Sequence, residues 1–198
     1  MLGCVTPNLP LRRDLRLRFR SLRRQLDEPE RAEADRRIVA EVLALPVVQR
    51  AARLGLFQAF DGEPDLASVA TWALAQGRTV AYPRHTPGAP LAFVEAERWG
   101  GGAGGAPQPE GRPVALERGD VVLVSGAAFD SDGYRLGLGG GHYDRTLATC
   151  KALAVGIAYA CQRIERLERA PWDQPVEFLV TEAGVQSFQG RASVSSWS

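Results

Sequence analysis

A glycine-rich stretch flanked by charged and aromatic side chains is the most chemically suggestive part of the 198-residue sequence. It runs from Gly126 to Arg145 and reads GAAFDSDGYRLGLGGGHYDR. Four of the five positions from Gly137 to Gly141 are glycine, which lets a backbone approach a ligand closely. A helix that begins directly after them would offer free N–H groups and a positive dipole end to a phosphate. Glycine runs also occur in flexible surface loops, so the glycines alone leave both interpretations open.

The neighbours of the glycines favour a phosphate site. The stretch is not a P-loop, because no Gly-Lys-[Ser/Thr] follows, and His142 breaks the dinucleotide-binding pattern. Arg135 and Arg145 can neutralise phosphate charge. Asp144 can bind Mg²⁺, and Tyr143 can stack or donate a hydrogen bond.

Two amphipathic helices are predicted before this stretch. Apolar residues recur at steps of three and four from Leu11 to Leu26, which is one stripe of a helix. Asp27 and Glu30 form the pattern of a capping box at the start of a second helix, and Pro46 marks its end. A third helix is expected between Asp65 and Gly77, and a fourth between His142 and Ala152.

Short apolar runs between the helices predict buried strands. They are Arg53–Phe60, Arg78–Tyr82, Leu91–Glu95, Asp120–Val124, Ala154–Tyr159 and Glu177–Thr181, the last clear strand. Residues 97–118 are rich in Gly and Pro without periodicity, so a long loop is expected there, and such loops are more often functional or mobile than idle.

Strands that alternate with helices indicate the α/β class. We expect a single three-layer domain over residues 11–189, with an open, mostly parallel sheet flanked by helices. Residues 1–10 would be a flexible leader and residues 190–198 a disordered tail. Ligands bind at the carboxyl ends of parallel strands, so the site is expected in the loops after Phe57, Tyr82, Val124 and Tyr159.

Composition excludes several other classes of protein. The formal net charge is +1, and no apolar run approaches the roughly 20 residues of a membrane span, so no nucleic acid or membrane partner is expected. No secretory signal is recognised. Cys4, Cys150 and Cys161 are widely spaced and contain no Cys-x-x-Cys pair, which favours a reduced, cytoplasmic protein. Two histidines, His85 and His142, are too few for a histidine-based metal site. We expect a monomer.

The glycine-rich stretch resembles the signature of the 5-formyltetrahydrofolate cyclo-ligase family. That signature is Ala-Phe-Asp and then Gly-x-Arg-Leu-Gly-x-Gly-x-Gly-x-Tyr-Asp-Arg, found here at residues 128–130 and 133–145. Further similarities follow in the family's order from about residue 11 to 183: Arg12, Leu15, Arg16, Phe57, Gly62-Glu63-Pro64, Tyr82-Pro83-Arg84, Gln162, Asp173 and Val180-Thr181-Glu182.

This resemblance implies ATP-dependent conversion of 5-formyltetrahydrofolate to 5,10-methenyltetrahydrofolate, with release of ADP and phosphate. ATP would be the co-substrate and Mg²⁺ the cofactor. A formamide oxygen is a poor leaving group until ATP phosphorylates it, after which N10 attacks the activated carbon. Such chemistry depends on positioning and on charge neutralisation.

The resemblance also implies the site residues. Catalytic residues would be Arg135, Tyr143 and Arg145. ATP would contact Arg12, Arg16, Arg135, Gly137, Gly139, Gly140, Gly141, His142, Tyr143 and Gln162. The folate would contact Arg16, Phe57, Gln58, Glu63 and Tyr143, with Glu63 accepting hydrogen bonds from the pterin. Asp144 and Asp173 would bind Mg²⁺. Arg12 and Arg16 are one helical turn apart on one face, so both can reach one anionic ligand.

Four positions depart from the family pattern. Arg12 replaces a lysine, Gln108 a glutamate, Ser125 a proline and His142 a tyrosine. They leave open a folate- or nucleotide-binding paralogue with weak or no turnover. RNA binding by the arginine-rich segment 12–24 is a further alternative, disfavoured because exposed aromatic residues are not interleaved with the arginines.

His142 also suggests a pH effect. A histidine beside polyphosphate gains a proton more easily, so ATP affinity is expected to strengthen as the pH falls through the pKa of the histidine. The alternative is that the imidazole only fills the space of the usual ring.

Overall fold

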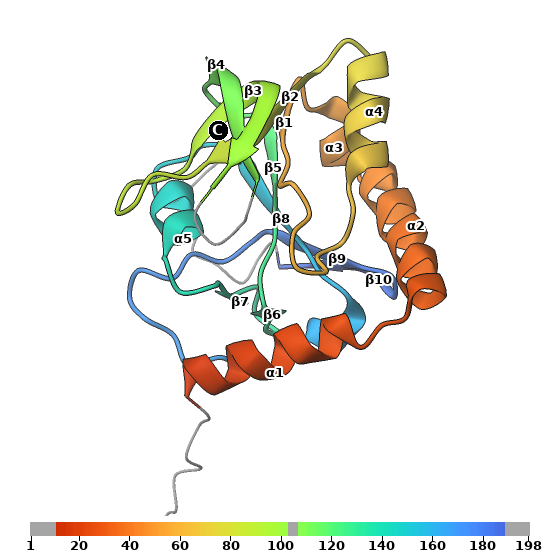
Figure 1. Cartoon of the computed structure of the whole chain (residues 1–198), viewed down its shortest axis with the longest axis vertical. Helices are drawn as coiled ribbons and strands as arrows, with labels where there is room; N and C mark the ends of the chain where they lie inside the picture. The colour runs from red at the N-terminus through yellow and green to blue at the C-terminus, as the bar shows by residue number, and fades with distance from the viewer. Residues whose placement is uncertain (1–10, 103–106, 189–198) are drawn as a thin grey trace, which may run out of the picture.

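The computed structural model describes residues 11–102 and 107–188 of the chain (Figure 1). The expected leader and tail therefore lie outside the described residues. The elements in chain order are α1 (Arg12–Arg24), α2 (Glu28–Ala44), α3 (Pro46–Arg50), β1 (Arg53–Gly55), α4 (Ala67–Ala75), β2 (Thr79–Arg84), β3 (Ala92–Gly101), β4 (Pro107–Val114), β5 (Val121–Val124), β6 (Ala128–Phe129), β7 (Arg135–Leu136), α5 (His142–Leu147), β8 (Leu153–Ile157), a 3₁₀ helix (Ala160–Gln162), β9 (Phe178–Thr181) and β10 (Gly184–Ser187).

Eight of these strands form one sheet in the order β10-β9-β8-β5-β1-β2-β3-β4. The central strands from β9 to β2 are parallel to one another, with Leu54 of β1 opposite Val80 on one side and Val121 on the other. The pairs β9–β10, β2–β3 and β3–β4 are antiparallel. The expected α/β class with a mostly parallel sheet is confirmed, and the antiparallel strands lie at its two edges.

Both faces of the sheet are covered, which gives the expected three layers. In β5 the side chains of Val121 and Leu123 pack with α2, α3 and α4, whereas Val122 and Val124 pack on the opposite face. Figure 1 shows α2, α3 and α4 on one side of the sheet and α5 on the other, with α1 lying across one end. A strand buried on both faces reads as a continuous apolar run, which is why the sequence DVVLV predicted β5 correctly.

The predicted helix signals at the N-terminal end are confirmed. Asp27 accepts a hydrogen bond from the Glu30 N–H at 2.9 Å, and Glu30 accepts one from the Asp27 N–H at 3.2 Å, so the capping box starts α2. In α1 the stripe buries Leu15 and Phe19, but Leu11 is 70% exposed because it precedes the first helical turn.

The long loop expected at residues 97–118 is wrong. β3 continues to Gly101 and pairs with β4, so the segment is mainly a hairpin. Arg98 pairs with Glu110, and Arg112 with Glu95, across the two strands. A proline costs little on an edge strand, where its missing N–H does not interrupt a central ladder. The prolines of β4 are therefore the reason why a loop and not a strand was predicted at these residues.

Several boundaries also differ from expectation. β1 ends at Gly55, although the Leu56 N–H still donates to the Ala81 carbonyl, and β2 runs through Pro83 to Arg84. α5 ends at Leu147 instead of near Ala152, because the chain turns there before β8. β10 was not predicted. Gly184, with φ of 119°, supports the turn that pairs β10 with β9.

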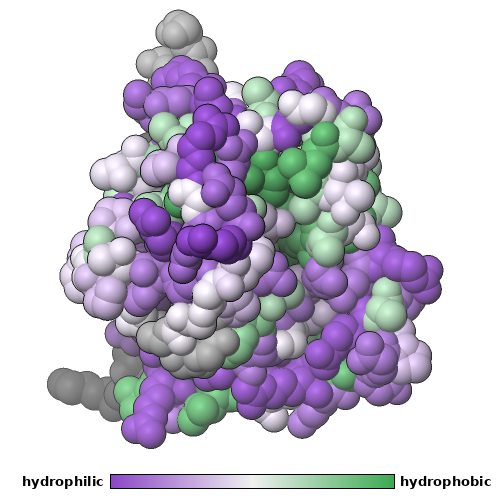
Figure 2. Space-filling model, turned by 45° about the horizontal axis from the view of Figure 1, so that its top comes forward, coloured by the Kyte–Doolittle hydropathy of each residue, from purple (hydrophilic) through white to green (hydrophobic). Residues whose placement is uncertain are grey.

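Hydrophilic residues cover most of the face seen in Figure 2, and hydrophobic residues gather in one patch towards its upper right. Within the described part of the chain, no helix has the length and apolar character to cross a bilayer.

Candidate active site

A small hairpin supports the glycine-rich loop. β6 pairs with β7, and the Asp130 side chain closes the turn between them by accepting hydrogen bonds from the N–H groups of Asp132 and Tyr134, both at 2.9 Å. Asp130 also pairs with Arg169 at 3.2 Å. This buried carboxylate therefore fixes the turn of the hairpin whose second strand, β7, leads into the glycine-rich loop.

Gln162 supports the backbone segment that leads into this hairpin. Its side chain is 1% exposed and donates to the carbonyls of Gly126 and Ala127 at 2.9 and 3.0 Å. Its carbonyl oxygen accepts from the Tyr159 N–H at 3.0 Å. These bonds hold the backbone that leads into β6, and the expected contact of Gln162 with ATP stays a prediction.

The glycine loop itself has a backbone that few other residues could adopt. Gly139 has φ of 113°, and Gly141, directly before α5, has φ of 63°. A Cβ atom at position Gly137 would meet no atom within 4 Å, so this part of the loop faces open space. Arg145 donates to the Gly140 carbonyl at 2.7 Å and fixes the loop against α5.

α1 lies along this loop and supplies two of the expected ATP-binding arginines. Arg16 donates to the Gly137 carbonyl at 2.7 Å, and burial and the nearby Arg12 charge lower its pKa. Arg12 forms an ion pair with Asp173 at 2.8 Å. The two arginines therefore project from one face of α1 as expected, but in this structure each has its own protein partner.

A cavity of about 300 Å³ opens between these loops. Its lining includes the expected site residues Phe57, Gln58, Glu63, Arg135, Gly137, Gly140, Gly141, His142, Tyr143 and Asp144. The loops after β1, β2 and β5 contribute to it as predicted, while the segment after Tyr159 lies beneath. Trp99 and Gln108 of the hairpin also line the cavity, and Trp99 packs edge-on against Tyr82 at 5.0 Å. The contribution of Trp99 was not predicted, because a long loop was expected at residues 97–118.

Glu63 is the buried carboxylate of the cavity. Burial raises its pKa, while the charge of Arg23 and a hydrogen bond from Ser125 act in the opposite direction. The Phe60 N–H donates to it at 3.3 Å. Such a carboxylate can accept hydrogen bonds from a ligand that carries neighbouring N–H donors.

Tyr143 offers a matching donor. Its hydroxyl is buried and has no hydrogen-bond partner among the described residues. Burial, and secondarily the charge of Glu63, raise the pKa of Tyr143, which keeps the hydroxyl protonated. A buried polar group without a partner is unfavourable, so this hydroxyl indicates a place that a ligand completes.

Arg135 and Asp144 form the charged floor of the cavity. Arg135 is 3% exposed and donates to Asp144 at 2.8 Å and to the Gln174 carbonyl at 3.1 Å. Burial lowers the pKa of Arg135, and the negative charges of Asp144 and Asp173 oppose that shift. Of the two expected magnesium ligands, Asp144 is therefore in direct contact with the buried guanidinium, and Asp173 acts on it through its charge.

The donor set fits magnesium bound together with a nucleotide. The described residues contain no group of three or more His, Cys, Asp or Glu side chains able to hold a metal ion by themselves. Mg²⁺ in nucleotide sites takes one or two carboxylates and completes its shell with phosphate oxygens and water. Asp144 and Asp173, which pair with Arg135 and Arg12 in this structure, would supply the hard oxygens for that arrangement.

The two histidines meet at the edge of the cavity, which the sequence did not predict. Their Nε2 atoms are 2.6 Å apart, and Arg145 donates to His142 Nδ1 at 3.0 Å. His142 Nδ1 also lies 3.3 Å from the Ala89 carbonyl oxygen, which only accepts, so Arg145 and Ala89 favour opposite tautomers of the neutral ring. Burial, and then the nearby His85 and Arg145, lower the pKa of His142. The surroundings of His142 therefore disfavour its protonated form, whereas a nearby polyphosphate is expected to favour it.

The other departures from the family pattern also have local partners. Gln108 accepts a hydrogen bond from the His85 N–H at 3.0 Å. Ser125 hydrogen-bonds to Glu63, which a proline side chain at that position cannot do.

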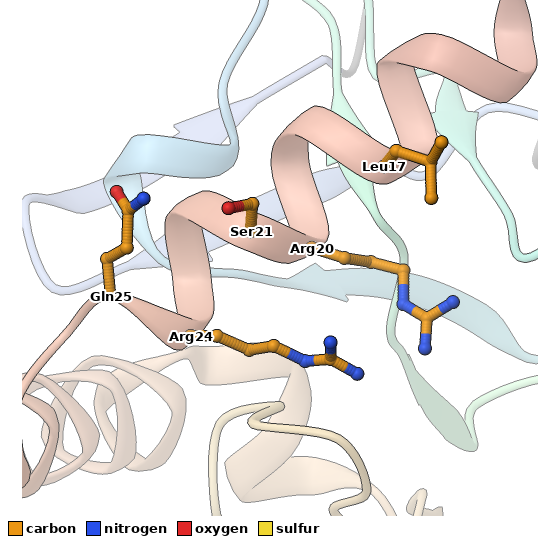
Figure 3. Close-up of a pocket in the computed structure, with 5 residues that line it drawn as sticks. All are labelled: Leu17, Arg20, Ser21, Arg24 and Gln25. Carbon is orange, nitrogen blue, oxygen red and sulfur yellow. The ribbon is translucent and has the colours of Figure 1, made fainter.

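A second hollow, of about 250 Å³, is lined by α1 alone: Leu17, Arg20, Ser21, Arg24 and Gln25 (Figure 3). Arg20 and Arg24 point to the same side of the helix in Figure 3, and both are paired with Asp61. Since one carboxylate pairs with both arginines, this surface keeps a net positive charge, and RNA binding stays an untested alternative.

The fold and the cavity define an α/β enzyme with a site for an anionic ligand at the carboxyl ends of its strands. The profile of the 5-formyltetrahydrofolate cyclo-ligase family matches residues 9–182. The chain belongs to this family and is therefore an ATP-dependent ligase of folate metabolism.

Similar proteins agree with this assignment. A 5-formyltetrahydrofolate cyclo-ligase of Escherichia coli K12 is 32% identical over 184 residues, covering 84% of this chain and 98% of that protein. One of Haemophilus influenzae is 28% identical over 186 residues, covering 85% and 96%. The NMR structure of Aquifex aeolicus 5,10-methenyltetrahydrofolate synthetase is 33% identical with a TM-score of 0.79, covering 95% of this chain and 98% of that one.

Proposed function

We propose that this cavity binds 5-formyltetrahydrofolate and ATP and closes the folate ring to give 5,10-methenyltetrahydrofolate, ADP and phosphate. The observation that carries the proposal is convergence around one cavity. The loop with the family signature, the buried Glu63 and Asp144 line it, although they come from distant parts of the chain. Asp173, the other expected magnesium ligand, lies near enough for its charge to act on Arg135.

The polyphosphate would lie along the glycine loop. Gly137, Gly139, Gly140 and Gly141 leave the backbone free of side chains, and Arg16 and Arg145 border the loop with positive charge. Arg12 would join them by exchanging part of its pairing with Asp173 for phosphate. Asp144 and Asp173 would hold Mg²⁺, which offsets negative charge on the phosphates when bound.

The folate would enter the part of the cavity lined by aromatic rings. Phe57, Tyr82 and Trp99 supply apolar surface, and Gln58 lines the mouth. Glu63 would accept hydrogen bonds from the N–H groups of the pterin. The free hydroxyl of Tyr143 lies near this carboxylate and can donate to a ligand oxygen.

Charge neutralisation is the main catalytic task of the site. The formyl oxygen attacks the terminal phosphorus and ADP leaves; N10 then attacks the activated carbon, loses its proton, and the carbon–oxygen bond breaks to release phosphate. Arg135 and Arg145 would stabilise the negative charge on the transferred phosphoryl group, and Tyr143 would orient the formyl oxygen. Preorganised donors in a buried site are effective because they need not reorganise during the reaction.

We also propose a monomer that works in the cytoplasm. Cys150 and Cys161, the two cysteines among the described residues, are both free thiols, as expected for a reducing compartment.

The test is incubation with 5-formyltetrahydrofolate, ATP and Mg²⁺ while the near-ultraviolet absorbance of the methenyl product is followed. We expect product only when all three are present. Glu63→Gln should raise the KM for folate about tenfold, because it removes charge-assisted hydrogen bonds, and leave the KM for ATP nearly unchanged. Glu33→Gln, an exposed substitution on α2, is the matched control. Folate binding without product would instead indicate a paralogue without turnover.

A further inference from the structure

Arg23 is the most completely buried charged residue in the described part of the chain. It lies on α1 with 0% of its surface exposed. Its Nε donates to the Asp61 carbonyl at 2.9 Å, and Nη2 donates to the Asp61 carboxylate at 3.1 Å. A buried guanidinium is tolerated only when its charge is compensated, so α1 must keep this side chain aligned with the loop after β1.

The third nitrogen of Arg23 points towards the active site. Nη1 is buried and has no hydrogen-bond partner among the described residues, and it lies 3.7 Å from Glu63 Oε1. That distance is an ion pair without a full hydrogen bond. Arg23 does not line the cavity, whereas Glu63 does. Any effect of Arg23 on a ligand therefore passes through Glu63.

Five groups act on Glu63, and one of them, the Phe60 N–H, favours the charged carboxylate by donating a hydrogen bond. Arg23 of α1 and Ser125 after β5 favour the charged carboxylate. Asp61 of the same loop opposes it, as does burial, and Tyr143 of α5 contributes a neutral hydroxyl. Arg23 is the one cation among these neighbours. Only an ionised carboxylate accepts hydrogen bonds at both oxygens, which is what two adjacent N–H donors of a pterin require.

We propose that Arg23 is a positioning residue for folate: anchored by Asp61, it orients Glu63 and keeps this carboxylate charged for the pterin. This inference rests on the proposed function of the cavity. On this view a residue of α1 supports the folate-binding carboxylate. The same helix carries the arginines proposed to bind ATP.

Arg23→Met tests this role, with Arg13→Met as the matched control, because Arg13 is exposed on the same helix. We expect Arg23→Met to raise the KM for 5-formyltetrahydrofolate about tenfold while the KM for ATP changes less than twofold. Without the cation, Glu63 takes up a proton at a higher pH. The rise in folate KM on acidification should therefore begin at a higher pH than in the wild type, whereas a purely structural role would leave that profile in place.

The Glu63→Gln background isolates the path of the effect. If Arg23 acts through Glu63, adding Arg23→Met to Glu63→Gln should change the folate KM by less than twofold. Additive effects of the two substitutions, or an unshifted pH profile in a folded Arg23→Met protein, would overturn the proposal.

Two further measurements keep the test decisive. If Arg23→Met does not fold, Arg23→Lys is used, because lysine keeps the charge but lacks the fork that holds Asp61 and faces Glu63 together. A severalfold higher folate KM is expected for it, and an unchanged value counts against the proposal. Calorimetry with 5-formyltetrahydrofolate alone measures the same effect as Kd. A wild type that binds folate without turnover would refute the proposed activity and leave the role of Arg23 testable.

Discussion

Asp61 joins α1 to the loop that carries Glu63, and its replacement should reveal how strongly the site depends on that junction. Its carboxylate accepts hydrogen bonds from Arg20 at 2.8 Å, from Arg23 at 3.1 Å and from Arg24 at 2.7 Å. Only 9% of the Asp61 side chain is exposed. One carboxylate therefore pairs with three arginines of the same helix.

Asp61→Asn is the appropriate change because it keeps the shape and removes the charge. Asp61 has φ of 56°, a left-handed conformation that asparagine adopts more readily than most residues. The substitution leaves Arg23 buried beside a neutral amide. Breaking a buried ion pair costs about 3–5 kcal/mol, and the amide retains one acceptor oxygen, so we expect a loss of about 3 kcal/mol. For a chain of this length that corresponds to a Tm lower by roughly 6–12 °C.

The pH dependence gives a second measure of the same junction. Burial alone would raise the pKa of Asp61, but the hydrogen bonds from Arg24 and Arg20 outweigh it and the pKa is lowered. A carboxyl group with a lowered pKa in the folded state stabilises the fold above its unfolded pKa of about 3.9. That stabilisation is lost as the pH falls through the folded value. The difference in the free energy of unfolding between Asp61→Asn and the wild type should therefore become smaller at strongly acidic pH.

Urea unfolding at neutral and acidic pH measures both effects. Glu33→Gln serves as the control, since the solvent-exposed pairs of Glu33 with arginines on its own helix contribute little to stability. A loss below 1 kcal/mol for Asp61→Asn at neutral pH, or a gap to wild type that does not change with pH, would refute the view that this carboxylate compensates a buried charge.

Three further predictions concern the ATP side of the site. Asp144→Asn and Asp173→Asn should each nearly abolish turnover with the fold intact by circular dichroism; a wild-type rate at limiting magnesium would remove that residue from the metal site. Arg12→Lys should be mild and Arg12→Ala should raise the KM for ATP, and equal, negligible effects would make residue 12 part of a solvated face. His142→Tyr should flatten the increase of ATP affinity on acidification, measured by titration after correction for the protonation of ATP, whereas curves parallel to wild type would mean that the ring only fills space.

Much of the fold could be read from local patterns. The apolar run of β5, the capping box of Asp27 and the stop at Gly77 each depend on neighbours in sequence, so periodicity and turn chemistry predict them. The site could be anticipated as well, because the residues from Gly126 to Arg145 carry chemistry at fixed spacing. The placement of that segment at the carboxyl ends of the strands followed from the α/β class.

The hairpin and the support of the site were decided only by tertiary structure. The prolines of β4 are compatible with a strand because β4 is an edge, and edge position is a property of the assembled sheet. Only the folded chain brings the Gln162 amide to the carbonyls of Gly126 and Ala127, which lie 36 and 35 positions away in the sequence.

The sequence by itself determined the class of the fold, the signature loop and the chemical types available for catalysis. It could not pair His85 with His142, or Arg23 with Asp61 and Glu63, because those contacts span 57 positions in the first case and about 40 in the second. The partner of a buried charge depends on which groups the fold brings together. The sequence around a charged side chain does not identify that partner.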